Sequence, residues 1–124
     1  RTPGGQLVVR LSESSQRVKL VASVAAVPPV LTPNGDGIND QSLITYDLVR
    51  VAEPVPARVA IYDLAGRLVR VLSDGEVIAG TWAHRWDGTQ TSGGLVAPGL
   101  YVARVEVRAA HETAVVQIVL AVAY

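Results

Sequence analysis

Turn-forming residues recur so often along this chain that only short strands fit between them. Clusters rich in Gly, Pro, Asn and Asp interrupt the sequence about every 8–12 residues, from Pro28-Pro29 to Pro98-Gly99. No window of about 11–18 residues shows the 3.6-residue apolar period of an amphipathic helix. The spacing therefore predicts an all-β chain that folds as an antiparallel β-sandwich of about seven to nine strands, with a closed barrel as the alternative.

The apolar segments between these turns define the expected strands. We predict a hairpin at residues 63–66, where Gly66 takes a positive φ, and a further turn at residues 73–75. Residues 42–49 alternate between two faces, which is typical of a strand with one buried side. The expected strands are residues 6–11, 17–24, 42–49, 58–62, 67–72, 80–86, 100–107 and 114–123.

Length and composition limit the number of domains and the classes of partner. The chain has 124 residues, which is enough for one ordinary domain. We divide it into residues 1–29, which are extra strands or the end of a preceding segment, and a sandwich domain at residues 30–124. The 11 basic and 11 acidic residues balance, which argues against a nucleic-acid or anionic-membrane partner. No apolar run reaches the about 18 residues of a membrane helix, and the absence of Cys excludes disulfides and thiolate metal sites.

Four motifs follow one another between about residues 30 and 110. They are Thr32-Pro33-Asn34-Gly35-Asp36-Gly37-Ile38-Asn39-Asp40, Ile61-Tyr62-Asp63-Leu64-Ala65-Gly66-Arg67-Leu68-Val69, Trp86-Asp87-Gly88 and Pro98-Gly99-Leu100-Tyr101. In this order and at these spacings, the motifs resemble the FlgD Ig-like domain family, the Ig-like domain of flagellar hook-capping proteins. The chain is also similar to related terminal domains of bacterial secreted and surface proteins, including gliding-motility-type C-terminal domains.

The resemblance implies a fold and a function class. It implies a seven-stranded immunoglobulin- or fibronectin-III-like sandwich without catalytic activity, found commonly at the C-terminal end of long exported proteins. Such domains serve there as spacers, assembly modules or sorting modules. We therefore expect a non-enzymatic, extracytoplasmic structural module whose partners are other domains of its precursor or neighbouring subunits.

The loop at residues 34–40 is a candidate calcium site. Oxygen-bearing side chains of Asn34, Asp36 and Asp40, with the carbonyl of Ile38, would supply hard ligands of the kind that Ca²⁺ prefers. An EF-hand is excluded, because Thr32 replaces its first acidic ligand and Leu43 its bidentate Glu. The alternative is a turn in which Asn and Asp cap the backbone and Gly supplies positive φ. The residue types are compatible with both interpretations.

Aromatic residues are expected mainly in the core. We predict that Trp86, Ile61, Leu68 and Tyr101 are buried, and that Asp87 bonds back into its own turn. The position of Tyr101 after Pro98-Gly99 resembles the tyrosine corner of Ig-type sandwiches, in which the hydroxyl ties down a loop. A carbohydrate-binding platform built from the rings of Trp82 and Trp86 is the alternative.

The sequence offers no constellation for catalysis. No G-x-S-x-G elbow surrounds any Ser, and nothing clusters with the two histidines at metal-ligand spacing. We interpret His84 and His111 as residues on strand surfaces. The prediction is therefore no enzyme, no catalytic residues and no cofactor other than the candidate Ca²⁺.

The uncharged stretch at residues 115–120 raises a question of pairing. Val115-Val116-Gln117-Ile118-Val119-Leu120 contains neither a charge nor Pro, so a solvent-exposed edge there would aggregate. This strand must be central, covered or paired with another chain. A second functional hypothesis follows, in which residues 114–123 or 6–11 add to a neighbour's sheet and build a surface polymer.

Overall fold

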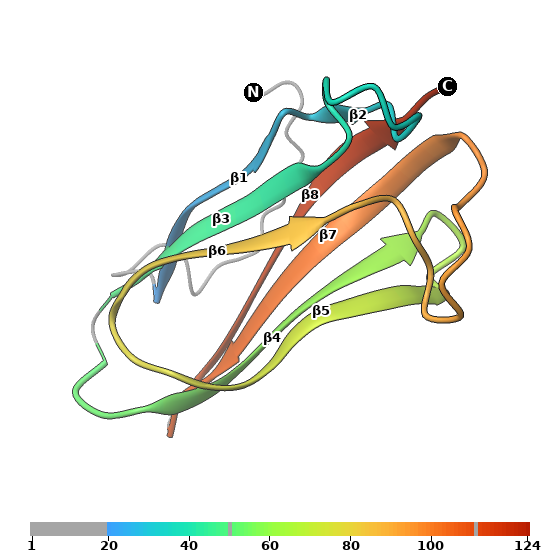
Figure 1. The fold of residues 1–124 in the computed structure, drawn as a ribbon. Helices are drawn as coiled ribbons and strands as arrows, with labels where there is room; N and C mark the ends of the chain where they lie inside the picture. Colours follow the sequence, from blue (N-terminus) through green and yellow to red (C-terminus); the bar gives the residue numbers. More distant parts are fainter. Residues whose placement is uncertain (1–19, 50, 111) are drawn as a thin grey trace, which may run out of the picture.

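The computed structural model describes residues 20–49, 51–110 and 112–124, and these form eight strands in two sheets (Figure 1). One sheet has three strands in the order β1-β3-β6, and the other has five in the order β2-β8-β7-β4-β5. This arrangement confirms the all-β sandwich that the sequence predicts. The strands are β1 (Val21–Val27), β2 (Val30–Leu31), β3 (Ser42–Leu48), β4 (Val55–Asp63), β5 (Leu68–Val77), β6 (Gly80–Trp86), β7 (Gly99–Arg108) and β8 (Thr113–Val122).

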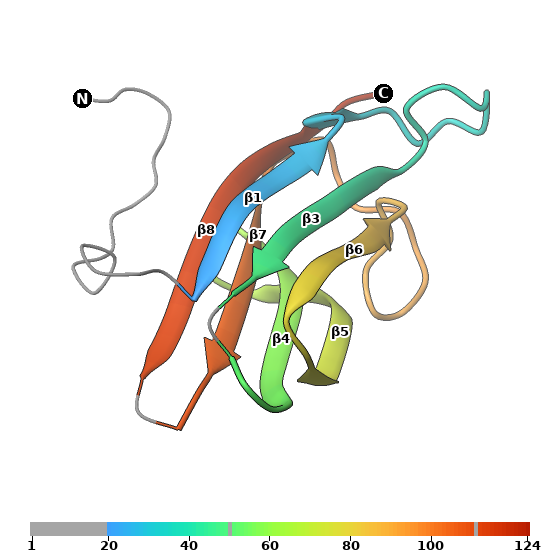
Figure 2. The same cartoon turned by 90° about the vertical axis from the view of Figure 1, so that its left-hand side faces the viewer.

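The two sheets stack face to face, with the three-stranded sheet over one side of the larger one (Figure 2). All pairs are antiparallel except β2 and β8, which run parallel over two residue pairs. No helix in the described part of the chain is long and apolar enough to cross a membrane. The sandwich therefore owes its stability to the side chains that lie between the sheets.

The core follows from alternation along the central strands. In β3, every second side chain from Ser42 to Leu48 is buried, and the residues between are half-buried. The same period-2 pattern places the odd-numbered residues of β4 and β7 inside, because successive side chains of a strand point to opposite faces. The fully buried large side chains are Trp86, Tyr46, Leu31, Ile44, Leu48, Ile61, Leu120, Val59, Val105 and Val107.

The predicted hairpin at residues 63–66 is confirmed. Asp63 accepts hydrogen bonds from the backbone N–H groups of Ala65 and Arg67, both at 2.9 Å, and its other oxygen forms an ion pair with the Arg67 side chain. Gly66 has a φ of +88°, which an L residue adopts only with strain. Local turn chemistry therefore determines where β4 reverses into β5.

Two expectations about β5 are wrong. Residues 73–75 are not a turn, because Ser73, Asp74 and Gly75 pair with β4 as a continuous part of the strand. Leu68 is not buried but 46% exposed. The reason is irregular pairing: the register shifts twice between β4 and β5, and the second shift sets Leu68 opposite Tyr62 on the outer face.

The predicted strand at residues 6–11 and most of the one at residues 17–24 lie outside the described residues. The described part begins with Leu20, and β1 continues to Val27, where it pairs with β3 as an edge of the smaller sheet. β1 therefore belongs to the sandwich although it precedes residue 30. The division of the chain at residue 30 stays a prediction.

Candidate functional site

The turn after β6 is anchored in the core by Trp86. Its ring is fully buried and meets Tyr101 edge-on, with ring centroids 5.6 Å apart and an interplanar angle of 63°. The indole Nε1 donates to the carbonyl of Thr89 at 2.9 Å, so the buried ring also holds the turn. The Tyr101 hydroxyl donates to the carbonyl of Ala97 at 2.5 Å, as expected for a tyrosine corner. Burial of Trp86, Tyr101 and Ile61 is confirmed.

Asp87 closes the same turn, as predicted. Its Oδ1 accepts from the Thr89 hydroxyl at 2.6 Å and from the Thr89 backbone N–H at 3.1 Å. Arg70 of β5 donates to the Thr89 hydroxyl oxygen at 2.8 Å and to the Gln90 carbonyl at 3.1 Å. The hydrogen bonds from Thr89 are the main cause that lowers the pKa of Asp87, and the charge of Arg70 adds to it. This network joins β5 to the turn after β6.

The carbohydrate platform is wrong. A sugar stacks on exposed aromatic faces, but Trp86 has no accessible surface. Trp82 is half-buried and packs against the core, and its Nε1 donates to the carbonyl of Ile78 at 2.8 Å. The two rings therefore share one face of β6, as their spacing requires, but that face is turned inward.

The loop at residues 34–40 is held by its own side chains. The Asp40 carboxylate accepts from the N–H groups of Gly35 at 3.0 Å and Gly37 at 2.6 Å. Asn34 accepts from the N–H of Asp36 at 3.1 Å, and Asp36 from that of Ile38 at 2.8 Å. All three proposed ligand side chains thus cap the backbone, and within residues 20–49, 51–110 and 112–124 no three His, Cys, Asp or Glu side chains form a metal-binding group. Calcium binding stays a prediction.

His84 is not a surface residue. It is half-buried on the inner side of β6, where its ring stacks on Tyr46 with centroids 6.0 Å apart. Nε2 of His84 and the hydroxyl of Tyr46 are both buried without a hydrogen-bond partner among the described residues. Burial lowers the pKa of His84 and raises that of Tyr46, because each charged form would lose its hydration. His111 lies outside the described residues.

One half of the outer face of the five-stranded sheet is apolar. Two adjoining rows of cross-strand neighbours build this apolar half. In the first row, Ala121 of β8 lies between Val30 of β2 and Leu100 of β7. The second row runs across β8, β7, β4 and β5 and consists of Val119, Val102, Tyr62 and Leu68. Leu100 is 50% exposed and Val119 46%. We call this set the apolar outer face; it consists of Val30, Tyr62, Leu68, Leu100, Val102, Val119 and Ala121.

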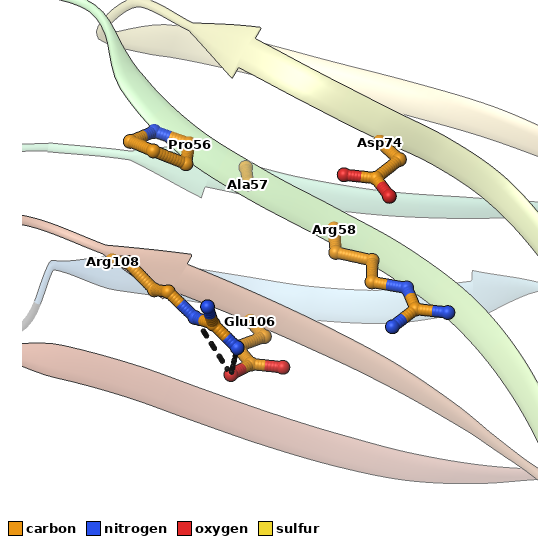
Figure 3. A pocket seen from close by; sticks show the side chains of 6 residues that line it. All are labelled: Pro56, Ala57, Arg58, Asp74, Glu106 and Arg108. Atoms are coloured by element: carbon orange, nitrogen blue, oxygen red, sulfur yellow. Dashed lines mark hydrogen bonds and ion pairs between the residues drawn. The ribbon is translucent and has the colours of Figure 1, made fainter.

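The other half of the same surface is charged. Figure 3 shows Arg58, Asp74, Glu106 and Arg108 around a hollow of about 150 Å³ over β4, β5 and β7. Arg108 donates to Glu106 at 3.0 Å, and Arg58 lies opposite both Asp74 and Glu106 in the ladder. Two positive and two negative side chains balance, and the hollow is smaller than the about 300 Å³ of ordinary ligand pockets. We call these four residues the charged outer face.

Comparison with known proteins places this geometry in a family. The family model of the FlgD Ig-like domain matches residues 36–111, which run from the loop after β2 through β7. This chain belongs to the FlgD Ig-like domain family. The match includes the Trp86 turn, the tyrosine corner and the charged outer face, and it confirms the resemblance that the four motifs indicate.

Two curated relatives share part of their length with this FlgD-like chain. The basal-body rod modification protein FlgD of Salmonella typhimurium is 33% identical over 95 residues, and that of Escherichia coli is 30% identical. The alignments cover 73% of this chain but only 40% of each relative. The chain therefore corresponds to less than half of those proteins.

Solved structures support the fold. FlgD from P. aeruginosa superposes with a TM-score of 0.52 and 24% identity, covering 66% of this chain and 61% of that one. Dimeric latent PorU from Porphyromonas gingivalis gives a TM-score of 0.61 at 23% identity, over 80% of this chain and 9% of PorU. At this level of identity, the likeness concerns the Ig-like sandwich alone.

The sequence did not single out the apolar outer face. Its residues come from β2, β4, β5, β7 and β8, and only the strand order makes them neighbours. A signal was present in residues 115–120, because Gln117 is their one polar residue, whereas the solvent-facing side of a strand usually carries several. That signal pointed to the strand but not to the surface that it builds.

Proposed function

We propose that this chain is a non-enzymatic, extracytoplasmic module that attaches a bacterial secreted or surface protein to a neighbouring protein through the apolar outer face. The observation that carries the proposal is the pair of exposed apolar rows centred on Leu100 and Val119. Monomeric proteins rarely leave a contiguous apolar surface uncovered, and such surfaces usually mark contacts with other proteins. Membership of the FlgD Ig-like domain family, whose curated relatives are basal-body rod modification proteins, supports a structural role.

The charged outer face sets the rim of this contact. Its charges are balanced, so it adds no long-range attraction to a partner of either sign. It would instead favour a partner whose own charges complement the alternating pattern of Arg58, Asp74 and Glu106. An apolar centre beside a polar rim is the usual anatomy of a protein interface.

Site-specific photo-crosslinking in the full-length parent protein tests the proposal. A photoreactive residue at Leu100 is expected to crosslink a neighbouring protein, whereas the same residue at the exposed Arg85, on the outer side of the three-stranded sheet, serves as the matched control. The variant Leu100→Asp/Val119→Asp should abolish retention of the parent at the cell surface while the sandwich still melts cooperatively. An absence of crosslinks from Leu100, or equal crosslinking from Arg85, would contradict the proposed contact.

A surface polymer joined by strand addition is the second candidate function. It requires a sheet edge with unpaired backbone groups, and β8 supplies one over most of its length among the described residues. Polymer growth would make the mass in solution depend on protein concentration. Light scattering of the chain over a hundredfold range of concentration therefore separates this function from attachment through the apolar outer face.

A further inference from the structure

The edge of β8 that faces away from β7 has few hydrogen-bonded partners among the described residues, although β1 lies beside it. β2 covers it only at Ala121 and Val122. The N–H groups of Ala121 and Ala123 donate to the carbonyls of Pro29 and Leu31 on this side. Because backbone groups alternate along a strand, those of Val115, Gln117 and Val119 point to the same side, where no described strand pairs with them. We call this stretch the open edge of β8.

Burial changes where the cover by β2 ends. Leu120 and Val122, which lie beside β2, are 2% and 3% exposed. Val116 and Ile118 point to the same core but are only half-buried. Along the open edge of β8, the larger sheet therefore has no further described strand to cover Val116 and Ile118, and the core stays partly accessible to solvent there.

An uncovered edge of this composition is not stable in solution. β8 carries neither a charge nor Pro, and these are the usual devices that keep a free edge from pairing with other chains. Uncharged segments rich in Val and Ile are also the typical signature of cross-β aggregation. This composition therefore favours a covering strand on the open edge of β8.

We propose that residues 6–11 of the same chain form this strand and pair antiparallel with β8. These residues lie outside the described part, so the argument rests on their sequence and on where β1 begins. In Gln6-Leu7-Val8-Val9-Arg10-Leu11, the side chains of Leu7, Val9 and Leu11 fall on one face, and Arg10 falls on the other. The apolar face covers Val116 and Ile118, and Arg10 stays in water.

The position of β1 brings the segment that precedes it close to the open edge of β8. β1 and β8 lie side by side at this margin of the sandwich (Figure 2). They lead to the same end, since β1 connects to β2, which pairs with the end of β8. A chain that turns back before β1 therefore runs antiparallel to β8. The nine residues 12–20 can span up to about 30 Å, whereas stacked sheets are about 10 Å apart. The tether also gives this segment a high effective concentration over any second copy.

Amide hydrogen exchange on the full chain tests the proposal with an internal control. The N–H groups of Val115, Gln117 and Val119 should be protected as strongly as those of Val116 and Ile118, which face β7. In Leu7→Asp/Val9→Asp, protection of the first three should fall about tenfold or more, while that of Val116 and Ile118 is retained. The matched variant Val8→Asp/Arg10→Asn also lowers the net charge by two, but on the outward face, and should leave all five amides protected.

Three outcomes would overturn the proposal. The first is rapid exchange of Val115, Gln117 and Val119 in the unmodified chain. The second is equal loss of protection in the two variants, which would mean that the alternation of residues 6–11 does not matter. The third is protection that disappears on dilution together with a dimer mass, which would identify a second copy as the occupant. The crosslinking from Leu100 is independent of all three, so a failure here leaves the proposed attachment unaffected.

Discussion

Two Asp-Gly segments lie against each other in this sandwich and use the same hydrogen-bond chemistry for different ends. In the turn at residues 87–89, Asp87 accepts from the N–H two residues later, and in the loop at residues 34–40, Asn34 and Asp36 do the same. The turn is tied to the core by the indole of Trp86. The loop is exposed, and among the described residues its side chains bond within the segment formed by residues 32–40.

A turn motif therefore does not by itself show how much stability depends on it. Both segments satisfy their backbone N–H groups with short polar side chains, which contributes about 0.5–1.5 kcal/mol for each hydrogen bond. Only the turn after Trp86 adds the burial of a large ring and a contact with another element. We therefore expect substitutions in the turn to lower the free energy of unfolding much more than those in the loop.

The largest difference is expected from the ring itself. Trp86→Ala should lower the free energy of unfolding by about 3–5 kcal/mol, because it leaves a cavity against Tyr101 and removes the bond to Thr89. Asn34→Ala should cost only about 1 kcal/mol, since it removes one exposed cap. Urea denaturation of both variants measures the two values. A loss below about 1 kcal/mol for Trp86→Ala would contradict the assigned anchor.

A pair of glycines offers a more closely matched comparison. Gly88 and Gly35 have φ values of +83° and +82°, so an added Cβ strains both backbones by about 1–2 kcal/mol. At Gly88 that Cβ would also lie 3.1 Å from Cγ of Pro33, whereas at Gly35 it would meet no atom of the described part of the chain within 4 Å. Gly88→Ala should therefore cost about 2–4 kcal/mol and Gly35→Ala about 1–2 kcal/mol.

Equal melting temperatures for these two alanine variants would show that there is no close steric contact between the turn at Gly88 and Pro33. In that case the contact between Gly88 and Pro33 would be loose enough to absorb a methyl group. The comparison is independent of side-chain hydrogen bonds, because neither substitution removes one.

Short-range features of the fold could be predicted from the sequence. The caps of Asp63 and Asp87 and the hydroxyl bond of Tyr101 were predictable, because each involves residues at most four positions apart. The alternation of β3 was predictable for the same reason. Local geometry determines these features, and local geometry can be read from a sequence.

Features that depend on strand order could not be predicted. Leu68 is exposed because of two register shifts against β4, and Asp74-Gly75 stays in a strand because β4 continues to pair with it. The contact of Gly88 with Pro33 joins two segments more than fifty residues apart. No local residue pattern predicts such long-range pairings. The apolar outer face also depends on them, because its residues come from five different strands.

A smaller change in the free energy of unfolding is expected when Asp87 in the turn is protonated at low pH. The hydrogen bonds from Thr89 lower the pKa of Asp87 in the folded chain. The unfolded chain therefore binds this proton more tightly, so the stabilisation is present above the unfolded pKa of about 3.9 and is lost as pH falls through the lower folded value. Because Asp87 is exposed, it should contribute less than about 1 kcal/mol. Unfolding measured between pH 2 and 6 should show a shallower acid limb in Asp87→Asn and in Thr89→Ala, and unchanged limbs would refute the assignment.

The smallest expected effect concerns calcium in the exposed loop. Extracellular Ca²⁺ modules have dissociation constants on the order of 10⁻⁴ to 10⁻³ M, so about 1 mM Ca²⁺ would add about 0.4–1.4 kcal/mol. Because Asp36 and Asp40 already accept backbone N–H groups, they gain less from a cation, and we expect the lower limit, a melting shift of about one to three degrees. Mg²⁺ should give less, since it keeps its waters more firmly. The shift should vanish in Asp36→Asn/Asp40→Asn and persist in Asp87→Asn, which leaves the loop intact. Identical melts with chelator and with Ca²⁺ would instead assign the loop to self-capping alone, and the turn and the loop would then differ only in their anchor.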